Sequence, residues 1–241
     1  MRNVTFMTFF RTVVIFFENR FRVNDLRNIP LPGNFTFSHF FLRDEPIRVD
    51  IPLTNIAQLK GSKSYKKDDE YQSIYEFGKE TYVRGDLRLR DDINGLVNHF
   101  LHSEGYLRIF YYEWNRQYIW ENDNGSHHFA VAYYHSINSG EDRLVPVKLT
   151  KYSFNSAAYS EYRKHYSIWI THKDNLETIF DLNWKFNLDM TVLDYPLNGS
   201  PNRIFVIPSE PKFLSELLRG NQHLFVPFER LFLDSFLNVF S

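Results

Sequence analysis

A glycine turn that leads from a strand-forming region into a helix constrains this chain more than any other feature. Residues 106–120 are rich in aromatic and β-branched residues, which favour two short strands. A polar stretch follows them and reaches Gly125, after which residues 129–137 have helical spacing. This order predicts an α/β unit, with the Gly125 turn at the edge of a mixed sheet.

The turn also predicts a site for phosphate. Gly125 lets the backbone approach a ligand closely, and the N–H groups and dipole of the following helix favour an anion. The candidates for phosphate binding are Asn124, Gly125, Ser126, His127 and His128. For Ser126, a helix cap or a phosphate contact is favoured over a nucleophile, because an adjacent histidine is not thereby aimed at its hydroxyl.

Two carboxylates lie just before the turn and have two interpretations. Glu121 and Asp123 fit the hard oxygen ligands that hold Mg²⁺ beside a triphosphate. They fit equally well as turn residues whose negative charge stabilises the start of a helix. The sequence leaves both interpretations open.

Further elements flank this region on both sides. Residues 49–56 predict a strand followed by a turn, and residues 143–149 predict another strand. Between them, residues 91–103 predict an amphipathic helix that ends before Gly105. Its apolar stripe consists of Ile93, Leu96, Val97, Phe100 and Leu101.

In this order, the segments resemble the ParB/sulfiredoxin-like fold family over about residues 47 to 152. The resemblance rests on the strand Val49–Leu53, the Gly125–His128 turn in place of the family's G-x-H-R turn, and the strand Val145–Val147. It implies that the turn holds the phosphates of ATP or another nucleoside triphosphate with Mg²⁺. Gly125, Ser126 and His127 would then make the phosphate contacts.

Two positions depart from the family pattern. His128 stands where the family has arginine, so the permanent charge and the bidentate fork are lost. Ser126 stands where sulfiredoxins have their reactive cysteine, and the chain contains no cysteine, which excludes thiol chemistry.

These features predict a nucleotide phosphate-binding protein. If it is an enzyme, the expected reaction is nucleoside-triphosphate hydrolysis or phosphoryl transfer, with no catalytic residue assigned. The alternative is a non-catalytic interaction protein or DNA-associated protein that retains the fold, and the loss of the arginine at His128 favours it. A helix-turn-helix pattern is not evident after residue 155.

Composition sets wider limits. The chain has 241 residues, 43% of them hydrophobic, and a formal net charge of −1. A substantial hydrophobic core is therefore expected. The net charge gives no general attraction to nucleic acid, so only a local basic patch could bind it. The partners expected are a nucleotide and, less specifically, another protein. We expect the fold class α/β (α+β), with a core domain at 47–152 flanked by extensions at 1–46 and 153–241.

The two extensions have weaker patterns. Residues 4–17 are strongly apolar but contain Arg11 and are too short to span a bilayer, so a buried element is favoured over an interfacial membrane anchor. A cytoplasmic protein is expected. In the C-terminal extension, residues 156–170 predict a helix, 203–208 a strand, and 212–219 and 228–240 two further helices.

Two residue classes invite functional interpretations that the sequence does not favour. His99, His102, His127, His128 and His135 could suggest a metal site, but the carboxylates near them have no ligand spacing, so structural histidines are favoured. Aromatic residues make up 18% of the chain and could suggest base stacking. Most of them fall at strand or helix core spacing, which favours packing.

Overall fold

The computed structural model describes residues 29–60, 73–85, 93–101, 105–114, 116–122, 124–187, 189–193, 202–209, 221 and 224–230. The chain divides into two compact units, Arg43–Ser153 and Met1–Leu42 with Phe154–Ser241. Several predicted features lie outside the described residues: the apolar stretch 4–17, His102, Asp123, the helix at 212–219 and most of the helix at 228–240.

The unit Arg43–Ser153 is built on one mixed sheet. Its strands are β4 (Ile47–Pro52), β5 (Ile56–Lys60), β6 (Leu107–Tyr112), β7 (Gln117–Glu121) and β8 (Leu144–Phe154). β8 pairs in parallel with β6 and antiparallel with β4, while β7 pairs antiparallel with β6 and in parallel with β5. Helices beside a sheet of mixed strand direction confirm the expected α+β class.

The predicted strands 49–53 and 143–149 form neighbouring strands of this sheet. Val49 lies opposite Val147, and Ile51 lies opposite Val145. The first strand begins at Ile47 and ends at Pro52, where a short 3₁₀ turn, Leu53–Asn55, follows.

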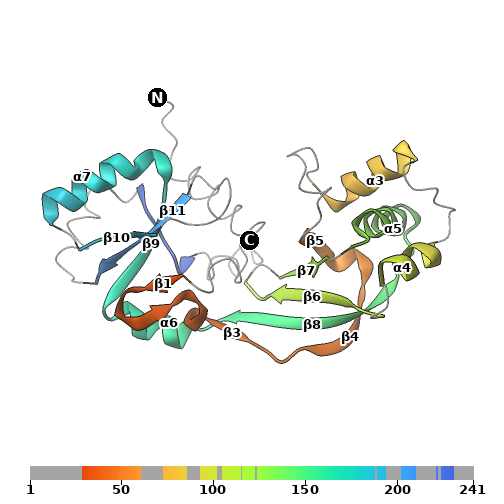
Figure 1. The fold of residues 1–241 in the computed structure, drawn as a ribbon, viewed down its shortest axis with the longest axis horizontal. Helices are drawn as coiled ribbons and strands as arrows, with labels where there is room; N and C mark the ends of the chain where they lie inside the picture. The colour runs from red at the N-terminus through yellow and green to blue at the C-terminus, as the bar shows by residue number, and fades with distance from the viewer. Residues whose placement is uncertain are drawn as a thin grey trace. The chain divides into compact units, whose positions relative to one another are not determined.

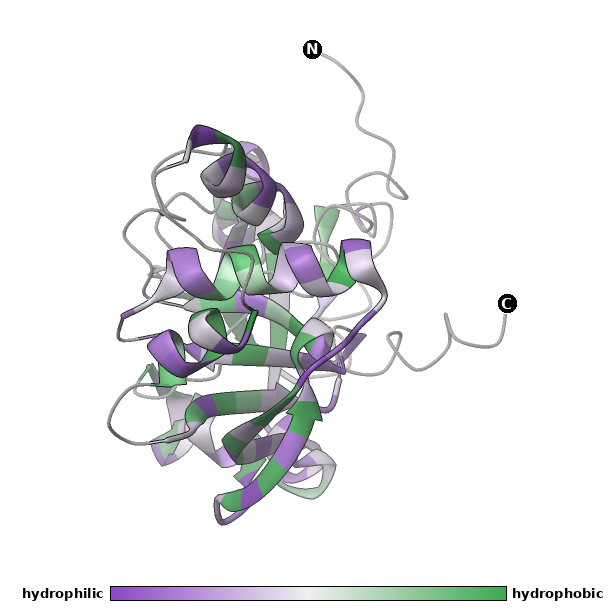
Figure 2. Ribbon diagram, turned by 90° about the vertical axis from the view of Figure 1, so that its right-hand side faces the viewer, coloured by the Kyte–Doolittle hydropathy of each residue, from purple (hydrophilic) through white to green (hydrophobic). Residues whose placement is uncertain are grey.

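Three helices cover one face of the sheet (Figure 1): α3 (Ile74–Arg84), α4 (Ile93–Leu101) and α5 (Ser126–Ser139). Apolar and polar residues alternate along the strands, so one face of the sheet is apolar and the helices pack on that face. On β8, Val145, Val147 and Leu149 are buried, whereas Lys148 is exposed on the other face. Figure 2 shows this alternation of hydrophobic and hydrophilic residues along the strands. The core also contains Leu96, Phe100, Ile109, Trp120, Phe129, Ala130 and Val131.

Helix α5 lies closest to the core, and its contact with α3 depends on a glycine. A Cβ built on Gly78 would lie 2.0 Å from the backbone oxygen of Ala130 and 3.0 Å from Cβ of Tyr134. The two helix backbones therefore meet at a point where no side chain fits between them. Ala130 is itself fully buried and small, which allows the same approach from the α5 side.

The other unit contains a second sheet, in the order β10 (Thr191–Leu193), β11 (Asn202–Pro208), β9 (Tyr166–His172) and β12 (Val226–Pro227). Helices α6 (Ser156–Arg163) and α7 (Leu176–Phe186) belong to the same unit, with the short strands β1 (Pro30–Leu31) and β2 (Phe35–Thr36) near the start of the described chain. Strand β3 (Phe41–Arg43) is instead the sixth strand of the mixed sheet, next to β8. None of the helices in the described part of the chain is long and apolar enough to cross a membrane.

The helix predicted for 156–170 is wrong in its second half. Helix α6 ends at Arg163, and the amides of Lys164 and His165 bond to carbonyls of the last turn. The following residues form β9, which pairs with β11 along its whole length. β-branched and aromatic residues from Ile168 to Thr171 suit this buried central strand better than a helix.

The Gly78 contact yields a test of the helix packing. Gly78→Ala should lower the free energy of unfolding by about 3 kcal/mol, because the added methyl group forces two helix backbones apart. Urea unfolding measures this. Lys79→Ala, at an exposed position of the same helix, is the matched control and should change stability by less than about 0.5 kcal/mol. If Gly78→Ala stabilised the protein, as at an open helix position, the close contact would be refuted.

Candidate functional site

Helix α5 begins at the turn that the sequence singled out. Gly125 is its N-cap and has φ 83° and ψ 13°, the left-handed conformation that glycine adopts without strain. Its N–H bonds to Oδ1 of Asn124 at 2.9 Å, and its carbonyl accepts the first helical bond, from the Phe129 N–H at 3.0 Å. No side chain caps this helix, and no acidic residue lies in its first turn.

The first three side chains of α5 lie against neighbouring elements. Ser126 is buried, with 8% of its surface exposed. The ring of His127 packs on Phe77 of α3, with 5.1 Å between ring centroids. The ring of His128 stacks on His99 of α4, with centroids 3.5 Å apart and an interplanar angle of 20°. The helix start is therefore held between α3 and α4, which fixes the direction of its backbone N–H groups.

Asn122 is a residue of this region that sequence reasoning did not select. It lies between the end of β7 and the turn, and only 8% of its surface is exposed. Its Oδ1 is buried and has no hydrogen-bond partner among the described residues. A buried amide oxygen left without a donor costs free energy, so its retention at this position needs a reason. The sequence feature that could have identified Asn122 is a polar residue directly after a predicted strand.

Glu121 occupies the last position of β7, beside Lys60 of β5 in the ladder. The preceding residue, Trp120, packs into the core against Phe100 and Phe129. Because successive residues of a strand point to opposite faces, Glu121 points away from the helix-covered face. Asp123 lies outside the described residues, so the magnesium pair of Glu121 and Asp123 stays a prediction.

The histidines do not assemble a metal site in the described part of the chain. Within it, no group of three or more histidine, aspartate or glutamate side chains is placed to hold a metal ion. His99 and His128 come together, but face to face. Imidazole lone pairs lie in the ring plane, so two nearly parallel stacked rings do not direct them at one point between the rings. His135 lies apart, against Tyr82, with its Nε2 buried.

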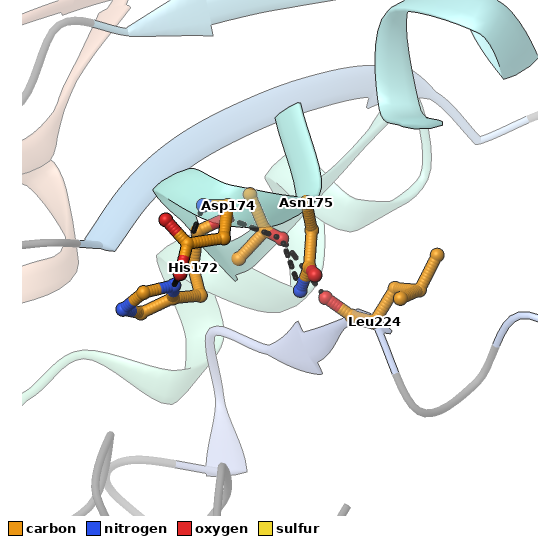
Figure 3. A network of polar contacts seen from close by, with 5 residues as sticks. His172, Asp174, Asn175 and Leu224 are labelled. Atoms are coloured by element: carbon orange, nitrogen blue, oxygen red, sulfur yellow. Dashed lines mark hydrogen bonds and ion pairs between the residues drawn. The ribbon is translucent and has the colours of Figure 1, made fainter. Parts of the chain in front are cut away.

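A second polar network lies in the other unit, at the start of α7 (Figure 3). His172 Nδ1 accepts the Asp174 N–H at 3.3 Å and lies 3.2 Å from the Asp174 carboxylate. The His172 side chain therefore caps the turn at the start of α7. Thr171 donates to the Leu224 carbonyl at 3.0 Å, and Asn175 lies beside Thr171. The network therefore joins strand, helix and loop, and it has the geometry of a structural cap.

A buried tyrosine in the same unit is also structural. Tyr159 donates to Oε2 of Glu229 at 2.8 Å, and Arg163 pairs with the other oxygen of that carboxylate at 2.8 Å. Burial raises the pKa of Tyr159, and the Glu229 carboxylate raises it further. The phenol therefore stays protonated at physiological pH and serves as a hydrogen-bond donor to Glu229.

One protein family matches this chain. Its model, described as a family of unknown function (DUF6685), matches residues 50–219, which include Asn122, the Gly125 turn and α5. No curated protein and no solved structure matches the chain.

Asn122 allows a test of whether this position serves folding. Asn122→Leu should keep or raise the free energy of unfolding, by up to about 1 kcal/mol, because it replaces a buried unpaired amide with an apolar group of similar size. Chemical unfolding measures the change. Asn98→Leu, at an exposed position of α4, controls for the general effect of the substitution. A loss of 2 kcal/mol or more would mean that the amide is needed for folding.

Proposed function

The chain belongs to this family of unknown function, DUF6685, so its role must be argued from its own site, and we propose that the Gly125 turn binds the phosphate groups of a nucleotide. The observation that carries the proposal is the left-handed Gly125 at the start of the 14-residue helix α5. A helix of this length presents its full dipole at the turn, and a glycine without a Cβ leaves the approach to the backbone open.

The local charges support an anion rather than a cation. The first turn of α5 has no acidic residue, and the residues around it, Asn124, His127 and His128, can donate hydrogen bonds. A histidine that becomes protonated adds positive charge at the same end of the helix. The packing of His127 on Phe77 and of His128 on His99 holds both rings beside the helix start.

Asn122 supports a ligand at this position in a different way. Its buried Oδ1 has no partner within the described residues, although such groups are nearly always paired in proteins. A bound nucleotide can supply the missing donor from a ribose hydroxyl or a base amino group. Unpaired polar groups of this kind persist where function rather than stability keeps them.

The proposed ligand class is a nucleoside triphosphate, such as ATP, with Mg²⁺. The chain runs from β4 through β5, α3, α4, β6, β7 and α5 to β8, and without β5 and α3 this is the order on which the resemblance to the ParB/sulfiredoxin-like fold rests. If the protein turns the nucleotide over, hydrolysis or phosphoryl transfer fits best, because positioning and electrostatics supply most of the catalysis of such reactions. Glu121 and Asp123 would then be the candidates to hold Mg²⁺.

A second candidate function is a non-catalytic interaction protein. The observation that favours it is His128, which stacks on His99 and lacks the planar guanidinium that binds phosphate at two points. Equilibrium dialysis with radiolabelled ATP, CTP and GTP, with and without Mg²⁺, separates the two functions. Saturable binding supports the nucleotide site, and turnover in the same samples supports an enzyme. No binding at millimolar nucleotide would favour the interaction protein.

The two ends of α5 provide a matched pair of variants. Gly125→Ala should weaken nucleotide binding at least tenfold, because a Cβ would stand at the phosphate approach and the backbone would be strained. Gly140→Ala is the control, since Gly140 caps the other end of α5 with a similar φ of 72° and open space around it. Calorimetric titration measures both. Equal nucleotide affinity of the two variants would show that the Gly125 turn is not part of the binding site.

His128→Arg tests the residue that departs from the family pattern. Arginine adds a permanent charge and a second donor, and its planar group can still lie on His99, so nucleotide affinity should rise about tenfold. The rise should be largest at alkaline pH, where histidine is uncharged. His165→Arg, at an exposed position of the other unit, is the control for added charge. A lower melting temperature without tighter binding would show that His128 is a packing residue.

A further inference from the structure

Three basic residues lie in one row across neighbouring strands of the unit Arg43–Ser153. Arg48 of β4 is the ladder partner of Lys148 of β8, and Lys148 is also the ladder partner of Arg108 of β6. The row is set by register alone, so residues far apart in the sequence come side by side. No spacing in the sequence indicated it.

The row lies on the face of the sheet opposite helices α3, α4 and α5. The buried neighbours Leu107, Ile109, Val147 and Leu149 belong to the helix-covered core, and alternation turns the residues between them to the opposite face. Arg48, Lys148 and Arg108 are all exposed. Neighbouring strands lie about 4.8 Å apart, so the three backbones span about 10 Å. That length suits consecutive phosphate groups better than a single phosphate.

A pocket opens at the Arg48 end of the row. It has a volume of about 320 Å³ and is lined by Arg48, Val49, Asp50, Tyr106, Pro146 and Val147. The guanidinium carbon of Arg48 lies 5.0 Å from the centre of the Tyr106 ring, a cation–π contact that orients the arginine. The pocket therefore combines an aromatic ring, a guanidinium group and one carboxylate with the apolar side chains of Val49, Pro146 and Val147.

We propose that this face binds single-stranded nucleic acid, with one base in the pocket and the adjoining phosphates along Lys148 and Arg108. An unstacked base can lie on the Tyr106 ring or the Arg48 plane, as bases do on single-strand-binding surfaces. The Asp50 carboxylate accepts a hydrogen bond from a base amino group, as aspartate does from cytosine. An acidic peptide offers no ring for the Tyr106 and Arg48 surfaces and no base amino group for Asp50, and this favours nucleic acid as the polyanion.

The proposal is independent of the Gly125 turn. One carboxylate accompanies the row, that of Asp50, which lies two residues after Arg48 on β4 and lines the same pocket. Three basic side chains therefore come together on one face, although the whole chain has a net charge of −1. Attraction to a polyanion is therefore local to this face.

Fluorescence anisotropy with labelled 20-residue oligonucleotides of dC, dT and dA tests the proposal on the full chain at low and moderate salt. The intact protein should bind them, with dC or dA preferred over dT, since thymine lacks an amino group for Asp50. Lys148→Gln and Arg108→Gln should each weaken binding several-fold and reduce the slope of log affinity against log salt by about 0.7. Asp50→Asn should reduce the preference for an amino base.

Lys151→Gln is the matched control, because Lys151 is an exposed lysine of the same strand outside the row. Lys151→Gln should retain its affinity for the oligonucleotides, and so should Gly125→Ala. Melting curves show whether each variant is folded. The proposal is overturned if the intact protein binds none of the oligonucleotides at low salt. It is also overturned if Lys148→Gln and Lys151→Gln bind alike, or if polyglutamate competes as well as unlabelled oligonucleotide.

Discussion

The close contact between helices α3 and α5 is the constraint on which the rest of the unit Arg43–Ser153 depends. A glycine at position 78 and a buried alanine at position 130 let two helix backbones meet without a side chain between them. This approach fixes α5 over the sheet, and Phe129 on the same helix then packs against Trp120 and Phe100. The direction of α5, and with it the direction of its N-terminal amides, follows from packing rather than from the turn.

Much of this fold could be predicted from the sequence because its elements carry strong local patterns. The strands 107–112 and 117–121, the helix around 93–101 and the glycine that begins α5 lie where periodicity and turn chemistry place them. The error at 164–170 has a clear cause. Tyr, Ile and Trp in that segment have some helical spacing, but the pairing of β9 with β11 and β12 decides its structure, in agreement with its β-branched and aromatic content.

The candidate site was predictable only in part. The Gly125 turn follows from glycine and the polar residues around it, and its left-handed conformation agrees with the close-approach argument. The packing of His127 on Phe77 and of His128 on His99 could not be predicted, since these partners come from other helices. Asn122 was missed for the same reason. An asparagine after a strand is common, and only the structure shows that its oxygen is buried without a partner.

The pairing of β4 with β8 has a consequence for the order in which the molecule folds. Val49 and Val147 are neighbours in the sheet but nearly a hundred residues apart in the chain, so closing that loop costs more entropy than forming the local β6–β7 hairpin. We expect β4 to join late, after the hairpin and α5 have assembled. Arg48 then reaches Lys148 only in the completed sheet. On this expectation, the complete row of basic residues forms only with the last pairing of the sheet.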